Sequence, residues 1–193
     1  MKNVIITGST GMIGGEVLQE CLQNKSIKKI TSIKEHFKNQ DLCIYCLAVY
    51  QNQVLKKEYK KITVDYLRAF ATLFKKMNTN ATFCLFSAAG ADLKEKSFMQ
   101  FARDKGAAEN VIINCNFKHA HIFRPGYIYP TKPRKEPNIL YSITRKLYKP
   151  IFSKIFPNSS ITSRELAKAM VITGLTTSGK IIYENKDIKK ICK

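Results

Sequence analysis

Short apolar segments recur along the chain, and longer amphipathic segments separate most of them. Residues 3–7 are β-branched and uncharged, which is the pattern of a strand buried on both faces of a sheet. The other expected strands are residues 28–33, 42–50, 82–87, 119–124 and 180–184. Strands that alternate with helices predict an α/β fold with a mostly parallel sheet.

The segments between these strands carry helical spacing. The expected helices are residues 12–24, 54–77, 97–114, 138–153 and 162–175. In residues 54–77 apolar side chains recur at steps of three and four, a face wide enough to pack on a sheet and also on a partner subunit. Ser97-x-x-Gln100 and Thr162-x-x-Glu165 have the spacing of capping boxes, so we expect a helix to start at each.

The link between the second and third expected strands is unusually short. Eight residues, 34–41, separate them, whereas a parallel crossover through a helix needs a dozen or more. Near-extended, such a link reaches roughly 26–29 Å, enough to cross to the far side of the first strand without a helix. The sequence therefore predicts a Rossmann-like, doubly wound sheet that is shortened at this point.

Length and composition describe one globular domain, residues 1–193. The chain has 193 residues, of which 45% are hydrophobic and 24% charged. Its longest uncharged apolar run, 42–50, is too short for a membrane span of about 20 residues. The first strand reaches a glycine turn before a signal-peptide core can form. We therefore expect a cytoplasmic location.

The charge balance is strongly basic. Lys and Arg number 33 against 14 acids, a formal net charge of +19. Such an excess attracts phosphate, nucleic acid or anionic lipid, although a general preference for lysine is the favoured explanation of it. The strongest local excess is in residues 132–154, whose expected helix has two interpretations besides a core helix: a lid over the cleft, or a surface for anionic lipid.

The six cysteines do not have zinc spacing, and we assign no metal site. Cys43 and Cys46 form the one close pair, in the third expected strand. Side chains at i and i+3 of a strand point to opposite faces. This pair is therefore expected to serve as small buried hydrophobic residues.

The clearest chemical signal is the glycine turn Thr7-Gly8-Ser9-Thr10-Gly11-Met12-Ile13-Gly14 between a buried strand and an apolar helix. The first glycine allows the tight turn, the second lets backbone approach a pyrophosphate, and the third permits close packing of the helix. Free N–H groups at the helix N-terminus then face the phosphates. In this context the motif predicts a dinucleotide site.

Together with this turn, the segments FSAAGAD around Ser87, Lys105-Gly106 and FRPG at 123–126 resemble the atypical short-chain dehydrogenase/reductases. More narrowly, they are similar to the Tat-interacting-protein-like branch, which is related to NAD-dependent epimerases and dehydratases. The resemblance extends from Asn3 to about Lys186. It implies a Rossmann fold that binds NADP(H) or NAD(H), with residues 126–193 as a small, helical C-terminal region on the substrate side.

The resemblance also implies the site residues. Ser87 and Lys105 take the places of catalytic residues, and Lys105 is expected to reach a nicotinamide ribose. The cofactor-binding residues would be Gly8, Ser9, Thr10, Gly11, Met12, Ile13, Gly14, Lys34, Leu47, Ala48, Lys105, Pro125, Gly126 and Tyr127. The residues alone allow a simpler interpretation. Lys105 would extend to solvent from a packed helix face that includes Phe98, Phe101, Ala108 and Ile112. Ser87 would be a hydroxyl at the end of a strand without a catalytic role.

One departure from the family concerns catalysis. Phe101 stands where the family has the tyrosine of Y-x-x-x-K, and a phenyl ring has no proton to donate. The leading interpretation is an NAD(P)(H)-binding oxidoreductase of unknown substrate, and the alternative is a non-catalytic protein that senses the cofactor or acts as a scaffold. Lys34, with Ser9 and Thr10, favours NADP(H) over NAD(H). Nucleic acid and anionic membrane are further partners that only the charge suggests.

Overall fold

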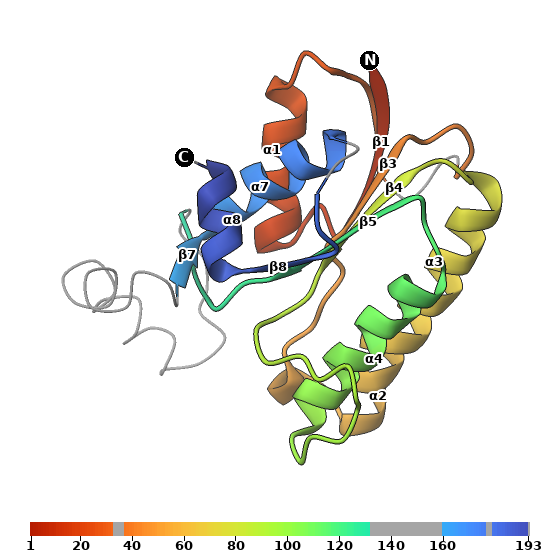
Figure 1. The fold of residues 1–193 in the computed structure, drawn as a ribbon. Coiled ribbons are helices and arrows are strands. Elements are labelled where there is room, and N and C mark those ends of the chain that lie inside the picture. The colour runs from red at the N-terminus through yellow and green to blue at the C-terminus, as the bar shows by residue number, and fades with distance from the viewer. Residues whose placement is uncertain (33–36, 132–159, 177–178, 193) are drawn as a thin grey trace.

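Figure 1 shows the fold in a computed structural model, which describes residues 1–32, 37–131, 160–176 and 179–192. A six-stranded sheet has the order β2-β1-β3-β4-β5-β8, and every neighbouring pair in it is parallel. Its strands are β1 Lys2–Thr7, β2 Ile27–Ser32, β3 Leu42–Tyr45, β4 Thr82–Phe86, β5 His119–Arg124 and β8 Ile182–Glu184. This arrangement confirms the Rossmann-like α/β fold.

Helices cover both faces of the sheet (Figure 1). On one face lie α1 Met12–Gln23, α7 Ser163–Leu175 and α8 Asn185–Cys192. On the other lie α2 Lys56–Lys60, α3 Tyr66–Met77 and α4 Gln100–Asn114. A π-helical turn, η2 Lys61–Asp65, joins α2 to α3, and a 3-10 turn, η1 Gln51–Gln53, precedes them. The predicted helix 54–77 is therefore present, with a different winding in its middle.

Two hydrophobic clusters hold these layers together. The cluster under α1 and α7 contains Val4 and Cys46, and the cluster under α3 and α4 contains Ile5 and Cys43. Consecutive residues of β1 thus contribute to opposite clusters, as the apolar sequence of that strand predicts. The two cysteines also lie in opposite clusters and are buried and free, which confirms their predicted role as small buried residues.

The shortened connection places β3 on the far side of β1 from β2. Leu42 pairs with Val4, while Val4 also pairs with Ile30 of β2. Within the described residues no helix or strand lies between β2 and β3. This confirms the predicted shortening. The third strand itself ends at Tyr45 rather than at residue 50, because the chain leaves the sheet into the exposed residues Leu47 and Ala48.

The predicted start of α4 was wrong. Ser97 does not cap this helix: its hydroxyl accepts the Met99 N–H, and its own N–H donates to the Asp92 carboxylate at 2.7 Å. The helix therefore begins at Gln100. Phe98 lies before the helix and is fully exposed, so it does not belong to the apolar stripe of Lys105. The second predicted capping box, between Thr162 and Glu165, is confirmed in α7.

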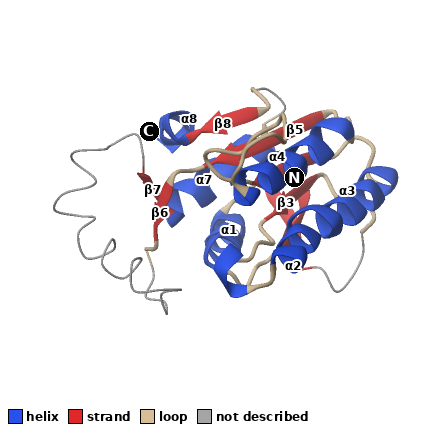
Figure 2. Ribbon diagram, turned by 90° about the horizontal axis from the view of Figure 1, so that it is seen from below, coloured by secondary structure: helices blue, strands red, loops and turns tan. Residues whose placement is uncertain are grey.

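The sequence pattern also missed two features of the C-terminal part. β6 Tyr127–Tyr129 and β7 Ser160–Thr162 form a separate parallel pair, which Figure 2 shows beside α7 and apart from the main sheet. Strands of three residues are too short to show alternation. Helix α8 follows β8 directly. Its sequence is rich in lysine, so the apolar position Ile188, which is buried in the structure, did not indicate a helix. Among the described helices none has the length and apolarity to cross a membrane.

The core contains one histidine whose charge state affects stability. His121 of β5 is buried, with its Nδ1 3.1 Å from the Lys180 carbonyl and its ring against Tyr183. Burial lowers the pKa of His121 below its usual value of 6.5. The folded state therefore favours the neutral ring, and around and below pH 6.5 the imidazole of residue 121 binds more protons in the unfolded state than in the folded state.

We predict that the free energy of unfolding falls as pH decreases from 7 to 5, by at most about 1.4 kcal/mol per pH unit from this group. In His121→Phe the contribution of His121 to this pH dependence of the free energy of unfolding should be absent. His119→Gln, on the same strand, should retain it. Urea unfolding followed by circular dichroism measures both. An unchanged slope in His121→Phe would exclude His121 as its source.

Candidate functional site

The glycine turn is held by contacts that leave no room for side chains. Gly8 has a φ of +71°, and a Cβ there would lie 2.9 Å from the carbonyl group of Cys46. A Cβ on Gly14 would lie 2.0 Å from the carbonyl oxygen of Gly8. The Thr7 hydroxyl accepts the Cys46 N–H at 3.0 Å, which ties the turn to the end of β3. Glycine at both positions therefore allows helix α1 to start directly against the strand ends.

The N-terminus of α1 has no side-chain cap. Gly11 occupies the N-cap position, the first turn contains no acidic residue, and the Gly11 N–H donates to Gly8 at 2.9 Å. Ser9 is half-buried and Thr10 is exposed in the same turn. The first turn of α1 thus contains no carboxylate. A helix end with these properties is suited to an anion.

The other predicted cofactor residues follow the carboxyl ends of neighbouring parallel strands. Leu47 and Ala48 come after β3, and both are exposed. Pro125 is buried after β5, while Gly126 and Tyr127 are half-buried. Because the strands are parallel, their carboxyl ends share one edge of the sheet with the glycine turn. The fold brings these groups to that edge.

Ser87, at the end of β4, is part of a buried polar network. It is 2% exposed, and its hydroxyl donates to the Glu109 carboxylate of α4 at 2.5 Å. Arg124 of β5 donates from Nε to both carboxylate oxygens of Glu109 at 2.9 and 3.1 Å, and Nη2 forms a further contact. Arg124 also pairs with Glu184 at 3.2 Å. The Ser87 proton is therefore directed at Glu109, in a network that joins α4, β4, β5 and β8.

Lys105 lies one helical turn before Glu109 on α4. It is 8% exposed, and its Nζ lies over the ring of Phe86 at 5.7 Å from the centroid. Within the described residues no carboxylate forms an ion pair with Lys105, since Glu109 is bonded to Ser87 and Arg124. Burial lowers the pKa of Lys105 to about 8, and the charge of Glu109 only partly opposes this shift. Such a pKa allows the amine to hold or release a proton near neutral pH.

Phe101 does not lie free at this edge. Its ring is half-buried and packs against Tyr59 of α2, with ring centroids 6.4 Å apart. Tyr59 is 1% exposed, and burial raises its pKa to about 12. A hydroxyl so placed cannot substitute for the proton donor that Phe101 lacks.

The turn after β5 is fixed from the C-terminal part of the chain. Asn185, the first residue of α8, accepts the Gly126 N–H at 3.1 Å and donates to the Ser160 carbonyl at 3.0 Å. The Pro125 carbonyl accepts the Ala89 N–H at 2.9 Å. The FRPG turn is thereby held between β7, α8 and the loop after β4.

Sequence reasoning missed Glu109 and Asn185. Glu109 follows Lys105 by four residues, so helical spacing placed both on one face, but a lone glutamate there is usually exposed. Asn185 showed no signal, because its partners lie far away in the sequence. Lys34 and the basic segment 132–154, with the expected helix 138–153, lie outside the described residues. Within the described ranges no three His, Cys, Asp or Glu side chains gather to hold a metal.

Comparisons with known proteins support the fold. No family profile and no curated protein sequence matches the chain. Among solved structures, UDP-N-acetylglucosamine 4-epimerase from Methanobrevibacter ruminantium M1, in complex with UDP-N-acetylmuramic acid, is 17% identical with a TM-score of 0.68, over 95% of this chain and 76% of that one. RMD from Pseudomonas aeruginosa complexed with NADPH is 12% identical, with a TM-score of 0.69 over 95% and 77%.

A third similar structure is UDP-glucuronic acid 4-epimerase from Bacillus cereus in complex with NAD. It is 14% identical with a TM-score of 0.67, over 97% of this chain and 80% of the epimerase. The TM-scores show a common fold. Its solved examples include an epimerase in complex with NAD and RMD in complex with NADPH. They also include a dTDP-4-dehydrorhamnose reductase from Yersinia enterocolitica.

The buried Lys105 leads to a prediction about stability. At pH 7 the fold contains a desolvated ammonium, so Lys105→Met should raise the free energy of unfolding by about 1–3 kcal/mol. The folded pKa of about 8 lies below the usual 10.5, so the unfolded chain binds more protons between these values. The contribution of Lys105 to the free energy of unfolding of the wild type should therefore become more favourable as the pH rises from about 8 to 10.5.

The difference between variant and wild type isolates Lys105, because the buried thiols, whose raised pKa acts in the opposite direction, are common to both. Lys57→Met, an exposed lysine of α2, is the matched control and should change stability little. Chemical unfolding from pH 7 to pH 10 makes the comparison. A Lys105→Met protein that is less stable at pH 7 would show that the lysine is a structural contact.

Proposed function

We propose that this chain binds a nicotinamide dinucleotide at the glycine turn and is an oxidoreductase of the atypical short-chain dehydrogenase/reductase kind, close to the Tat-interacting-protein-like branch. The observation that carries this proposal is the packing of Gly14 on Gly8, which brings the uncapped end of α1 to the carboxyl edge of the sheet. Lys105 adds a second polar group, a buried amine whose Nζ lies over the ring of Phe86 at the end of β4.

The residues present fit a dinucleotide. In this proposal the N–H groups of the turn and of the first turn of α1 hold the pyrophosphate, with Gly8, Gly11 and Met12 closest to it. Lys105 would hold the ribose next to the nicotinamide, and Gly126 and Tyr127 would contact the cofactor from the turn after β5. The cofactor supplies hydride chemistry, and the protein orients it and excludes water.

The proton for a reduced carbonyl is the distinctive problem of this site. Phe101 has none to donate, Ser87 directs its own to Glu109, and Tyr59 is buried between helices. Lys105 is a titratable group at this edge with a pKa, about 8, close to neutrality. We therefore expect the proton to come from Lys105, from water or from the substrate, and the reaction to be slower than with a tyrosine in place.

NADP(H) is proposed ahead of NAD(H). An NAD-selective site holds the ribose hydroxyls with an acid directly after the second strand, and this sequence has Lys34 in that region. Ser9 and Thr10, in the glycine turn, offer hydroxyls to a 2′-phosphate. Residues 126–193 would then form the substrate side. The second candidate function, a cofactor sensor or scaffold without catalysis, is favoured by Phe101.

The first prediction from this proposal concerns the glycine turn. Gly11→Asp places a carboxylate beside the phosphates, while aspartate is a good N-cap residue and should preserve α1. We expect the affinity for NADPH to fall at least about tenfold through charge repulsion. Asn80→Asp, at an exposed loop position before β4, is a charge-matched control. Calorimetry of NADPH binding that gave equal affinity for Gly11→Asp and wild type would refute the assigned site.

The second prediction distinguishes enzyme from sensor. Phe101→Tyr restores a phenol one helical turn from Lys105, and the half-buried ring position tolerates the added hydroxyl. NADPH-dependent reduction of carbonyl compounds should then rise by about tenfold or more. Phe98→Tyr, at the exposed position before α4, is the control. If wild type reduces carbonyls rapidly and Phe101→Tyr is no faster, the proton comes from elsewhere and our account of catalysis is wrong.

A further inference from the structure

The short link between β2 and β3 leaves part of the sheet without a helix above it. By register, Asn3 pairs with Lys29 and Ile5 with Thr31, so these four side chains share the α3–α4 face of the sheet. A hollow of about 820 Å³ lies there, at the end of the sheet where β1 and β2 begin. We call it the β1–β2 hollow. Its lining residues are Asn3, Lys28, Lys29, Phe37, Lys38, Asn39, Gln40 and Met77.

This hollow is distinct from the glycine turn. Asn3 lies near the start of β1 and Gly8 follows its end, and five residues of strand span about 16 Å. A ligand in the hollow would therefore not overlap with a pyrophosphate on the turn.

Charge in the hollow has one sign. Three lysines line it and no acidic residue does. All three are exposed, and within the described residues none of Lys28, Lys29 and Lys38 forms an ion pair. The adjacent carboxylate of Asp41 accepts the Asn3 N–H at 2.6 Å and keeps its negative charge. Three lysines against this one neighbouring carboxylate leave an excess of positive charge, which attracts a multiply charged anion.

The wall opposite the strands is held in place before any ligand arrives. Asn78 of the α3 end donates to the Phe37 carbonyl at 2.6 Å and accepts the Gln40 N–H at 2.8 Å. Asn3 donates to the Asn39 carbonyl at 2.8 Å, which ties this loop to β1 as well. Residues 37–40 are thus bonded on both sides, and a preformed wall reduces the entropy lost on binding.

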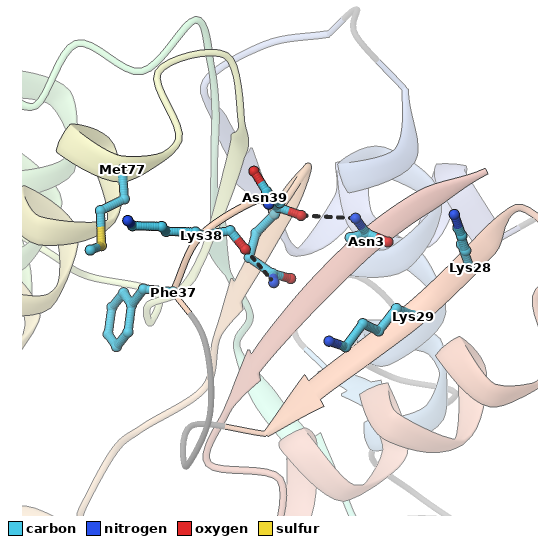
Figure 3. Close-up of a pocket in the computed structure, with 8 residues that line it drawn as sticks. Asn3, Lys28, Lys29, Phe37, Lys38, Asn39 and Met77 are labelled. Atoms are coloured by element: carbon cyan, nitrogen blue, oxygen red, sulfur yellow. Dashed lines mark hydrogen bonds between the residues drawn. The ribbon is translucent and has the colours of Figure 1, made fainter.

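This wall also has an apolar part. Figure 3 shows Lys29 extending from β2 toward the loop of Phe37 and Lys38, with Met77 next to Lys38. The Phe37 ring is half-buried and packs on Phe70 with centroids 5.1 Å apart. An aromatic ring and a thioether thus lie beside Lys38, at the side of the hollow toward which Lys29 extends (Figure 3). This arrangement suits a ligand with a flat apolar part as well as charge.

We propose that the β1–β2 hollow binds a small phosphorylated ligand with an aromatic ring, of the size of a nucleoside diphosphate. Lys28 and Lys29 hold its phosphates, and Phe37 with Met77 contacts the ring. The volume lies in the range of pockets that bind small molecules, about 300–1,000 Å³. The site lies between the edge strand β2 and the loop of residues 37–40. A longer crossover between β2 and β3, with a helix in it, would cover this place.

The test uses ADP and pyrophosphate as probes, and a Gly11→Asp background in which the glycine turn does not compete for phosphates. Calorimetry at low and physiological salt measures both probes. ADP should bind with one-to-one saturation and more tightly than pyrophosphate. Replacing Lys28, Lys29 and Lys38 together by Gln should lower the affinity for ADP at least about tenfold. This is the change expected when one charge-assisted hydrogen bond is lost. Phe37→Leu should lower the affinity for ADP and leave the affinity for pyrophosphate unchanged.

The matched control replaces Lys56, Lys57 and Lys60 of α2 by Gln, an equal loss of charge on another surface. It should retain ADP binding. Equal weakening in both triple variants, or no saturable ADP binding in the background protein, would overturn the site. Tighter binding of a single-stranded oligonucleotide than of ADP would also overturn it, in favour of an extended nucleic-acid surface. NADPH binding to wild type is measured separately, so failure here leaves the proposed function untouched.

Discussion

The close approach of three backbone segments determines the geometry of this protein. Gly14 lies against the carbonyl of Gly8, and Gly8 in turn lies against the carbonyl group of Cys46. One contact sets the position of α1 against β1, and the other sets the turn against the end of β3. Any side chain at Gly8 or Gly14 would force these segments apart, and the helix end would no longer reach the sheet edge where the buried polar groups of α4 and β5 lie.

That edge contains buried charges of two different kinds. Glu109 is completely buried but bonded to Arg124 and Ser87, so the cost of desolvating it is offset by partners. Lys105 is nearly as buried and has no ion-pair partner among the described residues. The free energy cost of desolvating its ammonium is therefore not offset by an ion pair. The first arrangement joins the sheet to α4, whereas the Lys105 ammonium lies over the ring of Phe86. This contrast is the reason why the proposed function gives Lys105 a role ahead of Ser87.

Much of the fold could be predicted from the sequence because its strong signals are local. The apolar strands β1, β3 and β4, the capping box of Thr162 and Glu165, and the short link before Leu42 were all recognised. The failures arise where tertiary contacts replace local ones. Asp92 accepts the Ser97 N–H, which Gln100 would accept in a capping box, and β6 pairs with a strand about thirty residues later. The candidate site shows the same division: the glycine turn was evident, whereas the partners of Ser87 and Gly126 were not.

The most direct measurement is a titration of the full chain with NADPH and with NADH, followed by nicotinamide fluorescence and calorimetry. The account predicts saturable one-to-one binding of both nucleotides, with NADPH the tighter of the two. Absence of saturable binding of either nucleotide at millimolar concentration would contradict it. The glycine turn would then be a structural feature of the fold without a ligand.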